Sequence, residues 1–225
     1  MTSRVEELLE HPHTVSLAVV GGTGEQGRGL ATRFAQIGHQ VTIGSRDLAR
    51  AKSAAESIRH AVDGSTNQVA VQSADVVVVA VPWAAHEETL HELRADLVGR
   101  VVIDCVNPLG FDSQGPFPLN VAEGSALQQA AMILPDSPVV GAFHHVSAVH
   151  LLDETLHTID TDVMVIGDDR TATSLVIALV NRLEGMRGVY AGRVRNAHQV
   201  EALTANLIAI NRRYKTNAGL RLTGL

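Results

Sequence analysis

Three glycines near the N-terminus have the spacing of a phosphate-binding turn. Gly22, Gly24 and Gly27 form a G-x-G-x-x-G pattern within "AVVGGTGEQGRGLATRF". In such a turn the first glycine permits a sharp bend, the second lets the backbone approach a pyrophosphate, and the third lets the next helix pack on the strand. The phosphates face the amides that begin this helix, where the helix dipole favours negative charge. The pattern predicts a dinucleotide site, with a purely structural turn as the alternative.

A serine and two arginines follow the next apolar run and bear on which dinucleotide binds. Ser45 and Arg46 end "HQVTIGSR", and Arg50 lies four residues further on. At this place an acid binds the 2′-hydroxyl of NAD, whereas arginine and serine suit the 2′-phosphate of NADP. The nearby acid, Asp47, is accounted for as a helix N-cap. We expect NADP rather than NAD, against the alternative that both arginines are solvated surface charges.

The acid–base groups of common reductases are missing from the sequence. Short-chain dehydrogenases use a tyrosine and a lysine four residues apart, but Tyr190 and Tyr214 have valine and alanine at that position. Of the eleven histidines, His144 ends an apolar run, where ligands bind in open sheets. It either donates a hydrogen bond to a bound ring or is a satisfied core histidine. With no acidic or cysteine partner beside it we expect no metal site, and direct hydride exchange between two stacked cofactors fits this pattern.

Short runs rich in valine and isoleucine predict the strands that position these residues. The predicted strands are 15–20, 40–44, 74–81, 100–106, 138–143 and 162–167. The predicted helices are 25–37, 47–61, 84–97, 121–134, 171–183 and 197–214, and a loop is predicted at 107–120. Strands that alternate with helices indicate an α/β, Rossmann-type, doubly wound fold with a mainly parallel sheet. The changed pattern near the C-terminus predicts a smaller C-terminal lobe.

The chain divides in this reading into an N-terminal extension (1–14), a dinucleotide-binding Rossmann domain (15–145) and the smaller lobe (146–225). Apolar residues make up 45% of the 225 residues and the net charge is −6, which indicates a globular protein and argues against nucleic-acid binding. The single cysteine, Cys105, lies in an apolar run and suits a reducing compartment. The acidic N-terminus is unlike a signal peptide, and the longest apolar stretch, 76–85, is too short to span a bilayer. We expect a cytoplasmic protein that contacts no membrane.

Together these motifs resemble a known family. "GGTGEQGRGLATRFAQIGHQVTIGSR", "VVVVAVPW" and "GAFHHVSA" are similar to segments of the NADPH-dependent coenzyme F420 reductases (F420:NADP oxidoreductases), and the resemblance extends to the C-terminal "NAGLRLTG". It implies reversible hydride transfer between NADP(H) and the 5-deazaflavin coenzyme F420, with the two rings stacked. It also implies a homodimer, and a C-terminal lobe that completes the deazaflavin pocket.

The resemblance further implies roles for individual residues. Phosphate contacts are expected from Thr23, Glu25 and Gln26 beside the glycines, and 2′-phosphate contacts from Ser45, Arg46 and Arg50. The nicotinamide side is expected to be lined by Val81, Pro82, Trp83 and Asn107, with Ala148 facing it across the cleft. His144 is expected to border the deazaflavin, and Ala218 and Gly219 to close its pocket.

Two other classes of function stay open. One is an NADPH-dependent reductase of a different acceptor, an imine, a flavin or ferric iron, because those enzymes share the same Rossmann start. The segment after the sheet is short for the helical dimerisation domain of imine reductases. The other class is a non-catalytic NADP sensor, although the acidic charge and the lack of a DNA-reading element argue against a transcriptional role.

Overall fold

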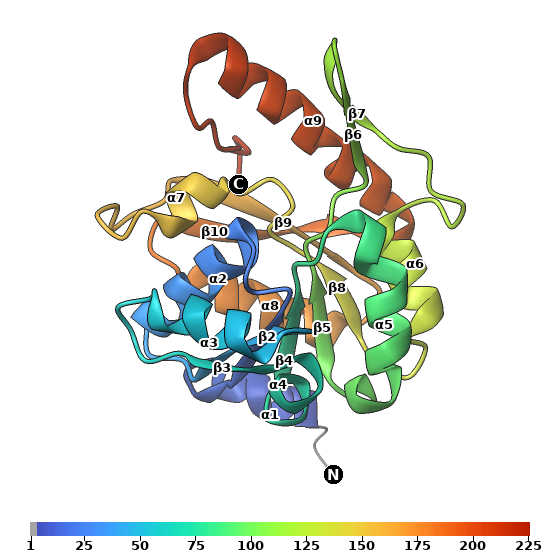
Figure 1. Ribbon diagram of the computed structural model, residues 1–225. Helices are drawn as coiled ribbons and strands as arrows, with labels where there is room; N and C mark the ends of the chain where they lie inside the picture. The colour runs from blue at the N-terminus through green and yellow to red at the C-terminus, as the bar shows by residue number, and fades with distance from the viewer. Residues whose placement is uncertain (1–3) are drawn as a thin grey trace.

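The apolar runs form an eight-stranded sheet in the computed structural model, which describes residues 4–225. The strand order is β10–β9–β8–β5–β4–β1–β2–β3 (Figure 1). The strands are β1 (Leu17–Val20), β2 (Val41–Ser45), β3 (Asp63–Thr66), β4 (Val76–Val79), β5 (Val101–Asp104), β8 (Val139–Gly141), β9 (Thr161–Gly167) and β10 (Met186–Gly192). Neighbouring strands run parallel except β8 and β9, which are antiparallel. The prediction of a mainly parallel, Rossmann-type sheet is confirmed.

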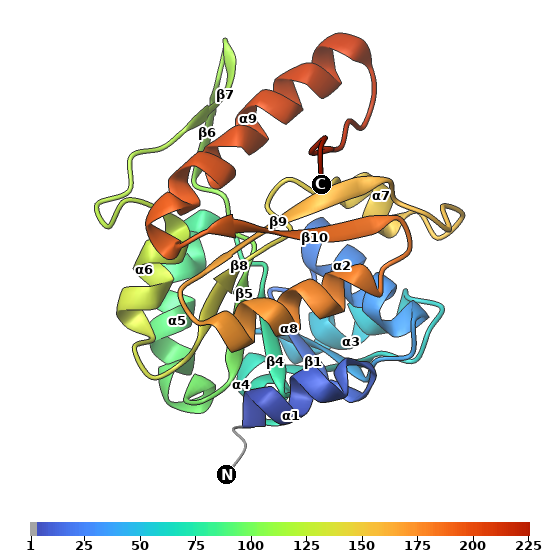
Figure 2. The ribbon, with the colours of Figure 1, turned by 180° about the vertical axis from the view of Figure 1, so that it is seen from behind.

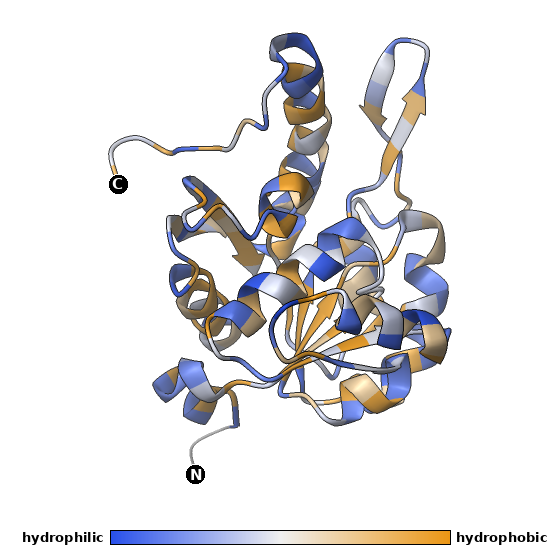
Figure 3. Ribbon diagram, turned by 60° about the vertical axis from the view of Figure 1, so that its left-hand side comes forward, coloured by the Kyte–Doolittle hydropathy of each residue, from blue (hydrophilic) through white to orange (hydrophobic). Residues whose placement is uncertain are grey.

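Helices cover both faces of this sheet. On one face lie α1 (Arg4–Glu10), α2 (Glu25–Gln36), α3 (Leu48–Glu56) and α8 (Arg170–Asn181). On the other lie α4 (Asn67–Gln72), α5 (Trp83–Leu97), α6 (Ala126–Ile133) and the start of α9 (Ala197–Tyr214). The four valines of β4 are all fully buried between these layers, and Figure 3 shows the apolar strands inside the helices. Burial of each valine side chain contributes about 1.5–3 kcal/mol, so the continuous apolar run stabilises the centre of the fold.

The N-terminal segment packs on the body of the protein. Helix α1 occupies most of the predicted extension, and its Leu8 is buried in the core. Arg4 binds the carboxylate of Asp75 at 2.6 Å. A short 3-10 turn, Pro12–Thr14, then leads into β1. Residues 1–3 of the predicted extension lie outside the described residues.

The predicted loop at 107–120 is wrong, because most of it forms an antiparallel hairpin. Strands β6 (Leu109–Asp112) and β7 (Gly115–Pro118) pair with each other, apart from the main sheet. The Asp112 carboxylate accepts hydrogen bonds from the amides of Gln114 and Gly115, at 2.7 and 3.1 Å, which closes the turn. Gly115 has a φ of +122°, a conformation that favours glycine. The turn-forming residues that suggested a loop are the residues that build the hairpin.

The C-terminal segment adds to the same sheet and then returns over it. Strands β9 and β10 continue the sheet beyond β8. The division of the chain near residue 145 into a Rossmann domain and a smaller lobe stays a prediction. Helix α9 and the β6–β7 hairpin lie at the end of the molecule opposite the N-terminus (Figures 1 and 2). After α9 the chain turns back to β9, where the Asp162 amide donates to Leu220 O at 2.7 Å and the Asp162 carboxylate binds Arg187 and Arg221. The last residues are therefore held against the sheet.

No helix within residues 4–225 is both long enough and apolar enough to cross a membrane.

Candidate active site

The glycine turn between β1 and α2 has the geometry of a phosphate cradle. Gly21 has a φ of +74°, and a Cβ there would lie 2.7 Å from Val81 Cγ1. The sharp bend therefore depends on Gly21 as well as on the predicted Gly22, whose amide donates to Val19 O at 3.2 Å within the turn. A Cβ on Gly22 would lie 2.7 Å from Val19 O, and one on Gly27 would lie 2.8 Å from Gly22 Cα, so both serve close packing. Gly24 differs, because a Cβ there would meet nothing nearer than 3.6 Å, so this glycine leaves open space on the cleft side that a ligand can fill.

A cleft of about 420 Å³ runs from this turn to the end of β2. Its walls include the following predicted residues: Thr23, Gly24, Glu25, Gln26, Ser45, Arg46, Arg50, Val81 and Pro82. Asp47 caps α3 as predicted, because its carboxylate accepts from the amides of Ala49 and Arg50 at 2.9 and 3.2 Å. The Ser45 hydroxyl accepts from the Asp47 amide at 3.1 Å and retains its own hydrogen for donation. The donors that a 2′-phosphate requires thus line one cleft with the glycine turn.

Arg46 lies at the mouth of this cleft. Its side chain is 69% exposed, and its Nη1 lies 3.9 Å from the Glu88 carboxylate on α5. An exposed pair at this separation contributes little to stability, so the guanidinium is available to an incoming anion.

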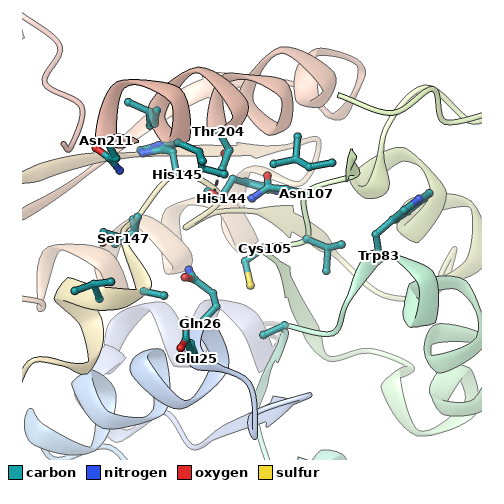
Figure 4. Close-up of a pocket in the computed structure, with 18 of the residues that line it drawn as sticks. Glu25, Gln26, Trp83, Cys105, Asn107, His144, His145, Ser147, Thr204 and Asn211 are labelled. Atoms are coloured by element: carbon teal, nitrogen blue, oxygen red, sulfur yellow. Dashed lines mark hydrogen bonds between the residues drawn. The ribbon is translucent and has the colours of Figure 1, made fainter. Parts of the chain in front are cut away.

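A second cavity, of about 570 Å³, adjoins the cleft. The two share a wall made of Glu25, Gln26, Ala80, Val81 and Pro82. The second cavity is also lined by predicted residues that come from distant segments: Trp83, Asn107, His144, Ala148 and Ala218 (Figure 4). The Trp83 ring points away from the other labelled side chains in Figure 4 and lies 5.5 Å from the His86 ring. The predicted Gly219 lines a smaller neighbouring cavity of about 260 Å³, together with Ala218.

His144 is held at the centre of this cavity wall by its backbone. Its carbonyl accepts from Asn107 Nδ2 at 2.7 Å and from Thr204 Oγ1 at 3.0 Å. Both ring nitrogens and Asn107 Oδ1 are buried and have no hydrogen-bond partner in the part of the chain that the structure describes. Burial lowers the pKa of His144 to about 4, so the ring is neutral at neutral pH. A satisfied core histidine is thus the wrong description, and a ligand with polar ring atoms would supply the absent partners.

The loop that carries His144 begins with a strained residue. Phe143 is fully buried and has a φ of +64°, which is unfavourable for a bulky side chain. Its carbonyl accepts from Gln26 Nε2 at 3.1 Å, so α2 and this loop are joined directly behind the cavity. His145 also lines the second cavity, but its Nε2 accepts from the Met164 amide at 3.3 Å, and burial lowers its pKa to about 4. Within residues 4–225 no three histidine, cysteine, aspartate or glutamate side chains are arranged to hold a metal ion.

A buried ion pair supports the end of β5, and sequence reasoning missed it. His86 Nε2 lies 2.7 Å from Asp104 Oδ2, and His86 Nδ1 lies 2.8 Å from Gln129 Oε1. Both partners are acceptors, so both ring nitrogens carry hydrogen. Burial disfavours the charged ring, but the Asp104 carboxylate outweighs burial and raises the pKa of His86. Asp104 Oδ1 accepts from the Val106 amide at 2.9 Å, which fixes the turn before Asn107. Asp104, an aspartate inside the apolar run "VVIDCV", was the feature of the sequence that could have indicated this pair.

Further site residues were absent from the prediction. On α9, Thr204, Leu207, Ile208 and Asn211 line the second cavity at helical spacing. Leu109 and Phe111 of the hairpin also line it, as does Cys105, whose thiol is buried and donates to Val79 O at 3.1 Å. Burial raises the pKa of this thiol, which makes Cys105 a packed residue rather than a nucleophile. In the nucleotide cleft, Asn67 from α4 and Thr89 from α5 were missed.

A glycine turn that opens α2, hydroxyl and guanidinium donors in one cleft and a second cavity that adjoins it are the features of a dinucleotide-dependent oxidoreductase of the Rossmann type. Residues 16–108 match the family described as NADP oxidoreductase, coenzyme F420-dependent. The chain is 38% identical, over 94% of its length and 96% of the other's, to a protein of Methanothermobacter thermautotrophicus named F420-dependent NADP reductase. It is 36% identical to the protein of the same name from Methanothermobacter marburgensis, over 94% and 99% of the two chains.

A solved structure agrees with these sequence relationships. The crystal structure of a putative F420-dependent NADP reductase from an Arthrobacter species has a TM-score of 0.82 and 26% identity, and covers 93% of this chain and 99% of that one. The protein described here belongs to the family of F420-dependent NADP reductases. Membership makes it an oxidoreductase, with NADP and coenzyme F420 as the implied cofactor pair.

Proposed function

We propose that this protein transfers a hydride reversibly and directly between NADP(H) and coenzyme F420, with no acid–base residue of its own. The observation that carries the proposal is the shared wall between the cleft and the second cavity. Two ligands that occupy them meet at Val81 and Pro82, where a nicotinamide at the end of the nucleotide would lie against a second ring. The proposed roles of the cleft residues follow: the glycine turn for the pyrophosphate, and Ser45, Arg46 and Arg50 for the 2′-phosphate.

The residues beside the proposed ring site hold the two rings in position and exclude water from them. They do not transfer protons. When bound, the cofactor pair supplies the redox chemistry: a hydride leaves one ring and reaches the other, and the balancing proton is exchanged with water. The lowered pKa of His144 and the raised pKa of Cys105 keep both side chains uncharged at neutral pH. Proximity and orientation of the two rings between fixed walls can supply most of the rate enhancement.

We further propose that the protein is a cytoplasmic homodimer. Large apolar side chains on the hairpin and α9 support a partner surface: Phe111, Phe117, Ile210 and Tyr214 are 60%, 41%, 39% and 73% exposed. Light scattering on the purified protein would give twice the chain mass if the proposal holds. A monomer at micromolar concentration would contradict it.

Turnover is the direct test of the function. The purified protein is mixed with NADPH and oxidised coenzyme F420, and the visible absorbance of the deazaflavin is followed, with NADH and FMN as controls. Loss of the deazaflavin colour with NADPH but not NADH is the expected result. Tight NADPH binding without turnover would favour an NADP sensor, and turnover with FMN or an imine alone would favour a reductase of another acceptor.

A further inference from the structure

Asn67 is a buried polar residue beside the proposed 2′-phosphate donors. Its predecessor Thr66 pairs with Ser45 across β3 and β2, and Asn67 begins α4. The residue is 9% exposed and lines the same cleft as Ser45, Arg46 and Arg50. The Asn67 side chain therefore reaches the nucleotide cleft from the connection between β3 and α4, whereas Arg46 and Arg50 follow β2.

The side-chain oxygen of Asn67 lacks a hydrogen-bond partner among the described residues. Its Oδ1 is buried, and no described residue offers it a hydrogen bond. Burial of an unpaired amide is unfavourable, so a residue with a purely structural role here would be apolar or paired. Because the residue also lines the cleft, the amide group sits where a ligand can provide what the protein does not.

The backbone at the end of β2 leaves room for the Asn67 amide. Gly44 precedes Ser45, and a Cβ on Gly44 would lie 2.9 Å from Asn67 Oδ1 and 3.2 Å from Asn67 Cα. Any larger residue would displace the amide. Gly44 has no positive φ that would explain the glycine, so the contact with Asn67 is its physical reason.

The chemistry of the carboxamide points to the base rather than the phosphate. Hydroxyl and guanidinium donors already line the cleft for a phosphate, from Ser45, Arg46 and Arg50. A primary amide presents one donor and one acceptor side by side, which complements the amino edge of adenine. We propose that Asn67 is a specificity-determining residue that recognises the adenine base of NADP(H) at its amino edge. The inference rests on the proposed nucleotide cleft and is independent of the hydride acceptor.

The test compares NADPH with its hypoxanthine analogue, in which a carbonyl replaces the amino group, so that the edge formed by this group and N7 presents two acceptors instead of a donor and an acceptor. Dissociation constants are measured by nicotinamide fluorescence without coenzyme F420, so a failed turnover assay leaves the result intact. The wild-type protein is expected to bind the analogue about tenfold more weakly than NADPH. The Asn67→Ala variant is expected to lose about tenfold on NADPH and to bind both nucleotides alike.

Two further variants make the outcome decisive. Gln68→Ala is the matched control, because the Gln68 amide bonds Asp96 at 3.0 Å and does not line the cleft, so it should behave as wild type. Gly44→Ala keeps Asn67 but displaces its amide, and it should also lose discrimination between the bases. Full adenine preference in both Asn67→Ala and Gly44→Ala would overturn the proposal. Loss of NADPH but not NADH affinity in Asn67→Ala would overturn it in favour of a phosphate contact.

Discussion

At the scale of single residues, the proposed selectivity between the two nicotinamide nucleotides depends on a few donors at the end of β2. Ser45 is fixed by its hydrogen bond with the Asp47 amide, whereas Arg46 is exposed and held by a long contact with Glu88. The same short segment thus contains a preorganised hydroxyl and an exposed guanidinium that an anion can reach.

Replacement of Arg46 by alanine should weaken NADPH binding about tenfold or more and leave NADH binding nearly unchanged. The reason is that a hydrogen bond to a charged group contributes about 1.5–3 kcal/mol, and only NADPH carries the 2′-phosphate. Titration of each nucleotide by fluorescence measures both constants. Arg59→Ala, at a side chain 81% exposed outside the cleft, serves as the control. An equal loss for the two nucleotides would disprove the assignment.

The buried histidines predict how stability depends on pH. Burial lowers the pKa of His144 and of His145 to about 4, below the ordinary value of 6.5. Between those values the unfolded chain binds protons that the folded chain does not, so each histidine lowers stability by about 1.4 kcal/mol per pH unit as the pH falls. The pKa of His86 is raised in the folded chain, so the stability that this residue contributes is lost as the pH rises through that pKa.

In the variant His144→Gln, one of these buried titrating groups is removed. Urea unfolding at pH 7, 6 and 5 should therefore show a smaller loss of stability on acidification than the wild type, by about 1.4 kcal/mol per pH unit. His91→Gln, at an exposed position on α5, is the control and should keep the wild-type slope. Parallel slopes for His144→Gln and wild type would mean that the pKa of His144 is the same in the folded and unfolded chains.

At the scale of elements, the sequence predicted the strands whose side chains are buried on both faces and missed those at the edges. The β4 valines gave a clear signal, whereas β3 is the polar "DGST" at one edge and β10 contains two glycines at the other. The glycine turn and the Gly44–Arg46 segment were found because local spacing defines them. Asn67, the His86–Asp104 pair and the cavity face of α9 depend on contacts between distant segments, which spacing does not encode.

Helix α7 (Ala148–Leu152) illustrates such a contact, because a single arginine of α2 holds it in place. Arg33 is 4% exposed and donates to the carbonyls of His150, Leu151, Asp153 and Leu156 at 2.5 to 3.0 Å. Gly29, one turn earlier, lets α7 approach closely, since a Cβ there would lie 2.6 Å from Leu151 Cβ. The position of Ala148 in the second cavity thus depends on α2, the helix that the glycine turn opens.

Arg33→Met should destabilise the protein by roughly 2–4 kcal/mol, because several buried carbonyls lose their donor. It should also raise the KM for coenzyme F420 more than the KM for NADPH, since Ser147 and Ala148 line only the second of the two compartments. Denaturant unfolding and initial rates measure the two effects. Arg28→Met on the same helix is the control, and a larger effect on NADPH than on coenzyme F420 would contradict the expected role of α7.

At the scale of the whole molecule, the second cavity is assembled from both ends of the chain. Its lining runs from the start of α2 to Asn217 and Ala218 in the C-terminal tail. The tail is fixed by Thr161 and Asp162: Leu220 N donates to Thr161 Oγ1 at 3.1 Å, and Leu222 N to Asp162 Oδ2 at 2.6 Å. The nucleotide cleft contains no residue of this tail.

Deletion of residues 218–225 should therefore separate the two affinities. Binding of coenzyme F420 should weaken by roughly tenfold, equivalent to about 1.4 kcal/mol, while NADPH binding stays as in the full chain. Calorimetry with each cofactor provides the comparison. Deletion of Leu225 alone, which is 75% exposed, is the control. If the shortened chain lost both affinities together, the tail would be needed for the fold rather than for one compartment.

The wall of Val81 and Pro82 between the cleft and the second cavity has a kinetic consequence. In the proposed arrangement each cofactor has a compartment of its own, so neither must depart before the other enters, and a ternary complex precedes the chemistry. Double-reciprocal plots at several fixed concentrations of the second cofactor should then intersect, as in a sequential mechanism. A flavin-like enzyme with one shared compartment would instead give the parallel lines of a ping-pong mechanism.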